Sequence, residues 1–295
     1  MSADPRGPGY IRRLRTTGLL FFAPALVLLA AFLIAPIFVA VFVSFTKFTI
    51  LSPPTFVGLA NYARIFTMPS FANSLQVTAI YVLARVAVLI ALALFIGTVI
   101  NQRISFSGFF TGVYFIPYVF PIAVVAVVWK LLYRPFGLIE QLTLPLGIGP
   151  ISWLTAGDYA LTAITISTVW SAVGYYAIIV LAGLQTIPKD VLEASVIDGA
   201  GAFRRFLHVV LPLLKPTLFY MVVVGVINSI RGFPPFLVMT GGGPGEATRV
   251  VGLIIYEFGF ARLRMGVASA MSVVVLAIIL IFTLVQMRLY RYDSA

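Results

Sequence analysis

The sequence contains no cysteine and only one histidine, His208. These absences exclude disulfides, cysteine-ligated zinc, thiol catalysis and a metal site built from histidines alone. Charged residues are also scarce: they make up 10% of the 295 residues, whereas a soluble domain carries about a quarter. The composition therefore excludes a soluble enzyme, a disordered protein and a nucleic-acid-binding protein.

Apolar residues dominate instead, at 61% of the chain with a mean hydropathy of +1.08. A helix needs roughly 20 apolar residues to cross a bilayer. We therefore predict an all-α, polytopic integral membrane protein with six transmembrane helices: Thr16–Thr46, Ser74–Ile100, Phe109–Trp129, Tyr159–Leu184, one within 215–231, and one within Met265–Met287. The first is predicted to be an uncleaved span, with a cleavable signal peptide as the alternative. The prolines and glycines of the spans, among them Pro121 and Gly174, are interpreted as ordinary for membrane helices.

The fifth span is short, because only 15 uncharged residues separate Lys215 from Arg231. Either Lys215 extends back to the membrane surface, or Arg231 lies within the membrane on a helix that continues toward Pro234.

The net charge of +11 is interpreted as a topology signal, since the basic residues flank apolar runs. With the N-terminus inside, eleven basic residues fall inside and eight outside. The predicted organisation is a cytoplasmic tail at 1–17, a transmembrane domain at 18–288 with a cytoplasmic loop at 185–215 and an external loop at 232–264, and a cytoplasmic tail at 289–295.

The loop at 184–216 has the pattern of a helix, a turn and a second helix. Asp190 and Glu193 follow Pro188 near a helix start, and Gly199 and Gly201 permit a sharp turn. The residues predicted to form one apolar underside are Leu192, Val196, Phe203, Phe206, Leu207 and Val210. Such an element suits docking into a cleft on a soluble partner. An amphipathic loop that only lies on the membrane surface is the alternative.

The same loop resembles the cytoplasmic signature of binding-protein-dependent ABC importer permeases: EAA, three residues, G, nine residues, I, one residue, LP. The matching positions are Glu193, Ala194, Ser195, Gly199, Val209, Leu211 and Pro212, and Asp198 also resembles the family. Ser195 in place of alanine and Val209 in place of isoleucine are conservative departures.

Two further patches are similar to the carbohydrate-uptake branch of that family, so the resemblance extends over the chain from about Thr17. They are FVGLANYARIF at 56–66, and TGGGP at 240–244 with GVASAMS at 266–272. The glycine run lacks the GK[ST] of a phosphate-binding loop and is predicted to be an external turn.

The resemblance implies the type I importer permease fold in a bacterial or archaeal inner membrane, and an import role for a sugar or related polyol. It also implies a second permease subunit, two copies of a cytoplasmic ATPase and an external solute-binding protein as partners. This chain would not be an enzyme and would bind no cofactor, because ATP and Mg²⁺ belong to the ATPase. Glu193 would contact the ATPase, Gly199 would form the turn, and Leu211 and Pro212 would anchor the loop to the fifth span.

Polar and aromatic residues within the spans are the candidates for the solute path, because unpaired polar groups are costly in a membrane. They are Arg85, Trp170, Tyr175, Asn228, Ser229 and Arg231. Aromatic faces and amide or guanidinium groups suit a sugar. The two arginines also suit a phosphorylated polyol such as glycerol phosphate. The alternative is packing between helices, or pairing with the partner permease.

Two other classes of protein are alternatives to an importer. An ion-coupled secondary transporter is expected to place carboxylates within the membrane, but all nine acidic residues fall in predicted loops, span ends or tails. An intramembrane enzyme would need a nucleophile with a base, or a metal cluster, and the predicted spans contain neither.

Overall fold

The computed structural model describes residues 8–102 and 107–293. Residues 1–7, Arg103 and residues 294–295, which belong to the predicted cytoplasmic segments, lie outside the described residues. The described chain is mainly helical, with one antiparallel hairpin of β1 (Thr46–Thr49) and β2 (Ser52–Phe56). It divides into two units, Met1–Ile65 with Phe258–Val274, and Phe66–Glu257 with Val275–Ala295.

Four helices are long and apolar enough to cross a membrane: Thr17–Ser44, Pro69–Asn101, Gly157–Gln185 and Met265–Tyr290. The first comprises α1 (Pro8–Leu29), the π-helical turn η1 (Ala30–Ile34) and α2 (Ala35–Ser44), and the others belong to α4 (Pro69–Asn101), α8 (Gly157–Gln185) and α15 (Met265–Asp293). Two bent pairs also qualify, Thr111–Val119 with Ile122–Leu132 and Ala202–Leu213 with Lys215–Arg231. The described residues therefore contain six candidate spans when each pair counts as one, as the sequence predicts.

The third span is broken rather than continuous. Its halves, α5 (Ser107–Val119) and α6 (Ile122–Leu132), meet at 101°. Pro121 adopts φ −54° and ψ 131° directly before α6, and a proline has no N–H to continue the helical hydrogen bonds. The interpretation of Pro121 as an ordinary membrane-helix proline therefore missed this break.

The fifth span is also bent, by 68°, where α11 (Leu211–Leu213) meets α12 (Lys215–Arg231). α12 ends at Arg231, and Gly232 and Phe233 separate it from α13 (Pro234–Met239). The alternative in which this helix continues toward Pro234 was therefore wrong.

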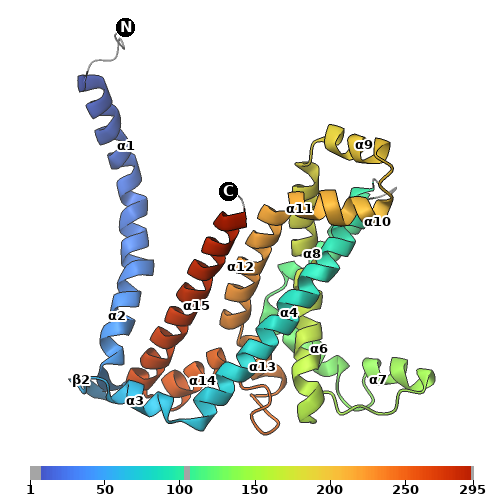
Figure 1. Ribbon diagram of the computed structural model, residues 1–295. Coiled ribbons are helices and arrows are strands. Elements are labelled where there is room, and N and C mark those ends of the chain that lie inside the picture. The colour runs from blue at the N-terminus through green and yellow to red at the C-terminus, as the bar shows by residue number, and fades with distance from the viewer. Residues whose placement is uncertain (1–7, 103–106, 294–295) are drawn as a thin grey trace. The chain divides into compact units, whose positions relative to one another are not determined.

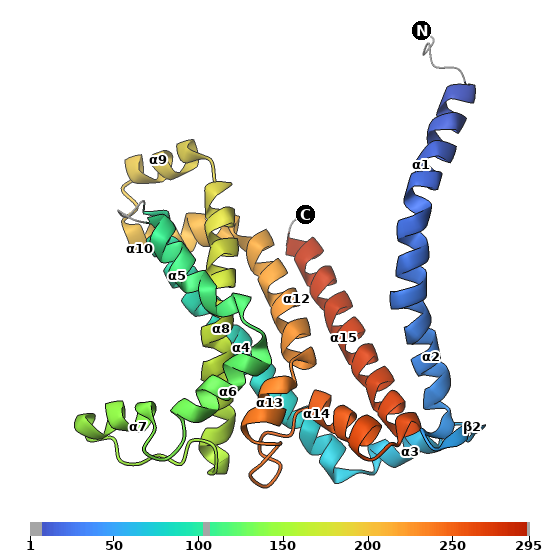
Figure 2. The same cartoon turned by 180° about the vertical axis from the view of Figure 1, so that it is seen from behind.

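The core of the second unit lies between α4 and α8, which cross in the middle of that unit (Figure 1). Two glycines permit close helix packing: a Cβ on Gly97 would lie 2.7 Å from Val180 Cγ1, and one on Gly174 would lie 1.8 Å from the carbonyl oxygen of Tyr114 in α5. Figure 2 shows α5 beside α8. The unit also contains α7 (Leu138–Thr143), η2 (Leu144–Leu146), α9 (Lys189–Ile197), α10 (Ala202–Arg205), η3 (Phe206–Val210) and α14 (Val251–Tyr256).

In the first unit, the end of α2, the hairpin and α3 (Ala60–Phe66) are joined to the start of α15, which follows η4 (Glu257–Ala261). The Asn61 side-chain amide donates hydrogen bonds to the carbonyl oxygens of Ser44 and Thr46, both at 2.8 Å. A Cβ on Gly266 would lie 2.0 Å from the Thr46 carbonyl oxygen, so only glycine fits there. Residues of two patches that are distant in the sequence, 56–66 and 266–272, therefore meet in one corner of this unit.

Candidate functional sites in the 184–216 loop and between the spans

The 184–216 loop is a helix, a tight turn and a second helix. α9 ends at Ile197, and Gly199 takes the left-handed conformation with φ +74°. The amide groups of Gly199 and Ala200 donate to the carbonyl oxygens of Val196 and Ser195, both at 3.0 Å, which closes the helix end. Gly201 has φ −61° and precedes α10. Only Gly199 therefore needs the conformational freedom of glycine.

The residues of α9 that resemble the importer signature lie partly on its exposed face and partly on its buried face. Glu193, Ala194 and Asp198 are exposed. Ser195 is buried, and its hydroxyl donates to the Leu192 carbonyl oxygen at 2.6 Å. The serine hydroxyl is satisfied within its own helix, so it takes the place of alanine without leaving an unpaired polar group.

The loop is attached to the second unit by a few apolar side chains. Leu192 and Val210 pack against the buried cluster that contains Leu184 and Leu214. Other apolar side chains face away: Phe203 is 77% exposed and Ile197 is 85% exposed. The prediction that Phe203 lies on the underside was therefore wrong. Val196, at 56% exposed, belongs only partly to that underside.

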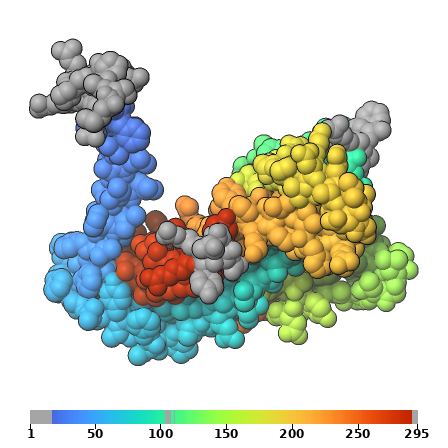
Figure 3. Space-filling model, turned by 45° about the horizontal axis from the view of Figure 1, so that its top comes forward, coloured from blue at the N-terminus to red at the C-terminus, as the bar shows by residue number. Residues whose placement is uncertain are grey.

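A cavity of about 530 Å³ separates the loop from the end of α4. Glu193 and Arg205 line it from the loop, and Thr98 and Asn101 of α4 line it together with Gln102, which follows that helix. Figure 3 shows the side chains of α9 and α10 as a continuous yellow and orange surface. Leu211 is half-buried, and Pro212 is exposed in the short helix α11 that precedes the bend.

A second cavity, of about 280 Å³, lies between the helices of the second unit. It is bordered by the broken end of α5, by α4, α8 and α12, and by the start of α13; the lining residues are Tyr81, Arg85, Pro117, Tyr118, Phe120, Ile122, Thr168, Ser171, Ala172, Asn228, Gly232 and Pro235. Because the third span is broken here, backbone and polar groups meet at a depth where a continuous helix would present only side chains.

Arg85 is the charged residue of this cavity. It lies in the middle of α4, and only 8% of it is exposed. Its Nη1 donates to Ser229 Oγ at 2.8 Å, and that hydroxyl in turn donates to the Gly225 carbonyl oxygen at 2.6 Å. Its Nε is buried with no hydrogen-bond partner among the described residues. Arg85 therefore lines the cavity with one of its donors, the buried Nε, unpaired among the described residues.

The structure brings together some of the residues predicted for the solute path. Arg85 and Asn228 line the cavity, and Ser229 holds Arg85. Tyr175 does not line it but stacks on Tyr118, with ring centroids 4.5 Å apart.

The remaining two candidates lie apart from the cavity lining. Trp170 is 45% exposed and contacts Trp129 edge-on at 5.6 Å. Arg231 is exposed at the last position of α12. Arg231 therefore does not line the cavity, whereas Asn228, three residues before it, does.

Sequence reasoning did not single out Tyr81, Tyr118, Thr168 or Ser171, which also line the cavity. The Tyr81 hydroxyl donates to Thr168 Oγ1 at 3.1 Å, linking α4 to α8. Spacing offered a signal: Tyr81 lies four residues before Arg85, and Ser171 three after Thr168, so each pair shares a helix face.

The glycine run at 241–245 forms a turn, as predicted. Gly241, Gly242 and Gly245 have φ of +62°, +90° and +55°. The hydroxyls of Thr240 and Thr248 lie 2.7 Å apart across it.

Beyond this turn, Arg249 forms ion pairs with Glu246 and Glu257. Burial lowers the pKa of Arg249, but hydrogen bonds and charge from these two carboxylates outweigh that effect and raise it. These contacts hold the segment after the glycine turn in place. The segment contains no phosphate-binding sequence.

Comparison with known proteins agrees with this architecture. Residues 89–292 match the family described as "Binding-protein-dependent transport system inner membrane component". The chain is 33% identical over 277 residues to the trehalose/maltose transport system permease protein MalF of Thermococcus litoralis, covering 93% of this chain and 94% of that protein. It is 34% identical to the sn-glycerol-3-phosphate transport system permease protein UgpA of Agrobacterium fabrum, covering 79% and 80%.

A solved structure gives the same fold. It is a bacterial ABC transporter involved in the import of the acidic polysaccharide alginate, with a TM-score of 0.83 and 17% identity over 96% of this chain and 99% of that one. The chain belongs to the binding-protein-dependent transport system inner membrane component family. It is a permease, the membrane-spanning subunit of an ABC importer, so the predicted resemblance is confirmed.

Proposed function

We propose that this permease forms half of the translocation pathway for a sugar or related polyol. A second permease subunit would form the other half, and an extracytoplasmic binding protein would deliver the solute. The cavity between the spans supports this role, since it combines aromatic rings with an amide and a guanidinium group. Aromatic faces cover the apolar faces of sugar rings, and polar groups bind their hydroxyls. The relative named for trehalose/maltose favours the same solute class. The relative named for glycerol 3-phosphate favours the phosphorylated alternative below.

The 184–216 loop is the proposed contact with the ATPase, with two ATPase copies per transporter and ATP and Mg²⁺ bound by them. The observation that carries this proposal is the turn at Gly199, which holds α9 against α10 while exposing Ile197 and Phe203. Exposed apolar side chains on a fixed helix pair suit a groove on a soluble protein. Glu193 and Asp198 add acidic contacts, Ala194 and Ser195 complete the helix face, and Leu211 and Pro212 transmit movement to α12.

Charge substitution on the loop tests this coupling. In proteoliposomes that contain the whole transporter, Ile197→Asp is expected to lower solute-stimulated ATP hydrolysis by more than about tenfold, because a buried unpaired carboxylate is costly at an interface. Leu146→Asp is the matched control, since Leu146 is 74% exposed in η2, outside the loop. Equal hydrolysis by both variants would overturn the proposed docking surface.

The orientation is proposed with both termini in the cytoplasm, which places this loop on the ATPase side and the glycine turn outside. In that orientation the dense basic cluster at the N-terminus lies inside. Cysteines introduced one at a time test it, because the chain has none of its own. In membranes that hold the permease without its ATPase, a cysteine at Phe203 is expected to react with membrane-impermeant maleimide only after the membrane is opened. A cysteine at Gly245 is expected to react without opening. The reverse pattern would contradict the orientation.

A phosphorylated polyol is the second candidate solute, and Arg85 specifically favours it. A buried arginine that lines a cavity, with no Nε partner among the described residues, suits an anionic group, because guanidinium binds phosphate bidentately. Competition in uptake assays separates the candidates. Glycerol 3-phosphate that competes better than maltose supports the anionic solute, and the reverse order excludes it.

An ion-coupled secondary transporter is no longer favoured, since the family is one of binding-protein-dependent systems.

A further inference from the structure

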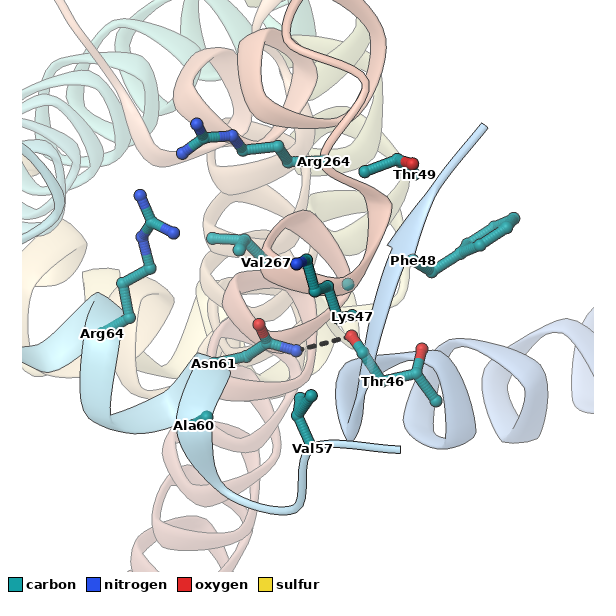
Figure 4. A pocket seen from close by; sticks show the side chains of 11 residues that line it. Thr46, Lys47, Phe48, Thr49, Val57, Ala60, Asn61, Arg64, Arg264 and Val267 are labelled. Carbon is teal, nitrogen blue, oxygen red and sulfur yellow. Dashed lines mark hydrogen bonds between the residues drawn. The ribbon is translucent and has the colours of Figure 1, made fainter. Parts of the chain in front are cut away.

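A cavity of about 420 Å³ lies within the first unit, and its lining differs from both sites above. The hairpin, α3 and the start of α15 line it (Figure 4). Among its described lining residues three are basic, Lys47, Arg64 and Arg264, and none is acidic. Figure 4 shows the guanidinium groups of Arg64 and Arg264 turned toward the same space. A cavity lined in this way attracts anions.

The frame of this cavity is well defined by hydrogen bonds. Asn61 holds the carbonyl oxygens of Ser44 and Thr46, and the hydroxyls of Ser44 and Tyr62 lie 2.7 Å apart. Gly266 allows the Thr46 backbone to approach α15. The basic side chains therefore extend from a preorganised corner, and binding an anion requires little ordering of the backbone.

The position along the chain indicates the depth of the cavity in the membrane. The candidate span Thr17–Ser44 ends just before Thr46, and the candidate span Met265–Tyr290 begins directly after Arg264. In a six-span chain the end of the first span and the start of the sixth lie on the same side of the membrane. Basic residues at span ends lie at the level of lipid headgroups.

Exposed apolar side chains accompany these charges on the same hairpin and the turn that follows. Leu51 is 85% exposed, Phe56 75% and Leu59 67%. Apolar side chains next to basic ones are typical of segments that lie in the membrane interface, where they contact acyl chains. The anion most available at this depth is a lipid phosphate.

We propose that the cavity lined by Lys47, Arg64 and Arg264 binds the phosphate group of an anionic phospholipid. Arg264 can offer paired N–H donors to phosphate oxygens, and Lys47 and Arg64 add positive charge. Leu51 and Phe56 contact the acyl chains. Soluble phosphate offers the same chemistry, so the test must separate the two sources.

The test uses the whole transporter, purified through this chain and placed in phosphatidylcholine nanodiscs. Phosphatidylglycerol is then titrated, and native mass spectrometry counts the molecules retained. The double variant Lys47→Gln/Arg264→Gln is expected to bind phosphatidylglycerol about 25-fold more weakly, at about fivefold for each basic residue near the membrane surface. The charge-preserving variant Lys47→Arg/Arg264→Lys is expected to remain within about threefold of the unmodified transporter.

Arg262→Gln is the control for charge loss outside the cavity, because it removes a positive charge from the same unit without changing the lining. Arg262 lies over the Phe258 ring, 4.5 Å from its centroid, and does not line the cavity. Equal retention by Arg262→Gln and the double variant would overturn the proposal. Release of the lipid by inorganic phosphate, but not by chloride at equal ionic strength, would overturn the lipid assignment in favour of a soluble anion.

Discussion

The cavity at Arg85 and the cavity at the hairpin hold positive charge in different environments. Arg85 is enclosed between helices and is held by the Ser229 hydroxyl, whereas Lys47, Arg64 and Arg264 are exposed around a hairpin. A buried cation loses its hydration, so its remaining donors gain strongly from a ligand that fits them. Exposed cations remain hydrated, and each adds only a modest, salt-screened attraction. If both proposals hold, loss of the sheltered arginine should affect transport more than loss of any one exposed basic residue affects lipid binding.

The largest expected effect comes from removing the sheltered charge. Arg85→Gln is expected to lower uptake of an anionic solute about 100-fold, since hydrogen bonds to a charged group contribute about 1.5–3 kcal/mol and a buried charge adds to them. Uptake by the whole transporter in proteoliposomes measures it. Arg134→Gln, which removes an exposed arginine, serves as the control. If Arg85→Gln transports like the unmodified protein, the contrast between the two cavities fails.

The next effect concerns the frame of the exposed cavity. Gly266→Ala places a Cβ 2.0 Å from the Thr46 carbonyl oxygen, and such overpacking is expected to cost about 2 kcal/mol of stability. Gly112→Ala introduces the same methyl group where no atom lies within 4 Å, so we expect no loss there. Thermal unfolding in detergent compares the two. A Gly266→Ala protein as stable as Gly112→Ala would show that the corner is not close-packed.

A smaller effect is expected at the ATPase loop, where both cavities stay intact. Gly199→Ala forces a side chain into the left-handed conformation at φ +74°, which costs about 1 kcal/mol, or about fivefold in the population of the docking geometry. Solute-stimulated ATP hydrolysis is expected to fall accordingly. Gly201→Ala, at φ −61° with no atom within 4 Å of the new Cβ, should leave hydrolysis close to normal. Equal losses would assign the effect to something other than backbone conformation.

The smallest effect is expected for Ser195→Ala, which restores the family's alanine. Among the described residues, the hydroxyl of Ser195 bonds to the Leu192 carbonyl oxygen of its own helix. Its removal should therefore change stability by less than about 0.5 kcal/mol. A fall in the unfolding temperature of more than about 4 °C would indicate a further partner for this hydroxyl.

The six candidate spans and the helical loop could be predicted because they depend on local properties. Apolar length identifies a span, and the spacing around Glu193, Gly199 and Pro212 identifies the loop. The Gly199 turn also follows from sequence, because few other residues adopt a positive φ cheaply.

Features that depend on the packing of one helix against another were harder to predict from the sequence. The orientation of Phe203 depends on how the loop rests on α4 and α8, which helical periodicity does not reveal. The break at Pro121 was visible as a proline, but many membrane helices continue through prolines. Tyr118 and Thr168 line the same cavity because α5 packs against α8, and the sequence does not show that packing. The close approach of Tyr114 to Gly174 allows that meeting.

The subunit composition of the transporter tests most directly whether this permease works in an ATP-driven importer. This chain, tagged and purified from its own host in mild detergent, would be weighed intact by native mass spectrometry. We expect a mass that contains this permease, a second polytopic subunit and two ATPase copies, and we expect the ATPase to be lost when Phe203 is changed to aspartate. Recovery of this chain alone, under conditions that preserve other membrane complexes, would contradict it.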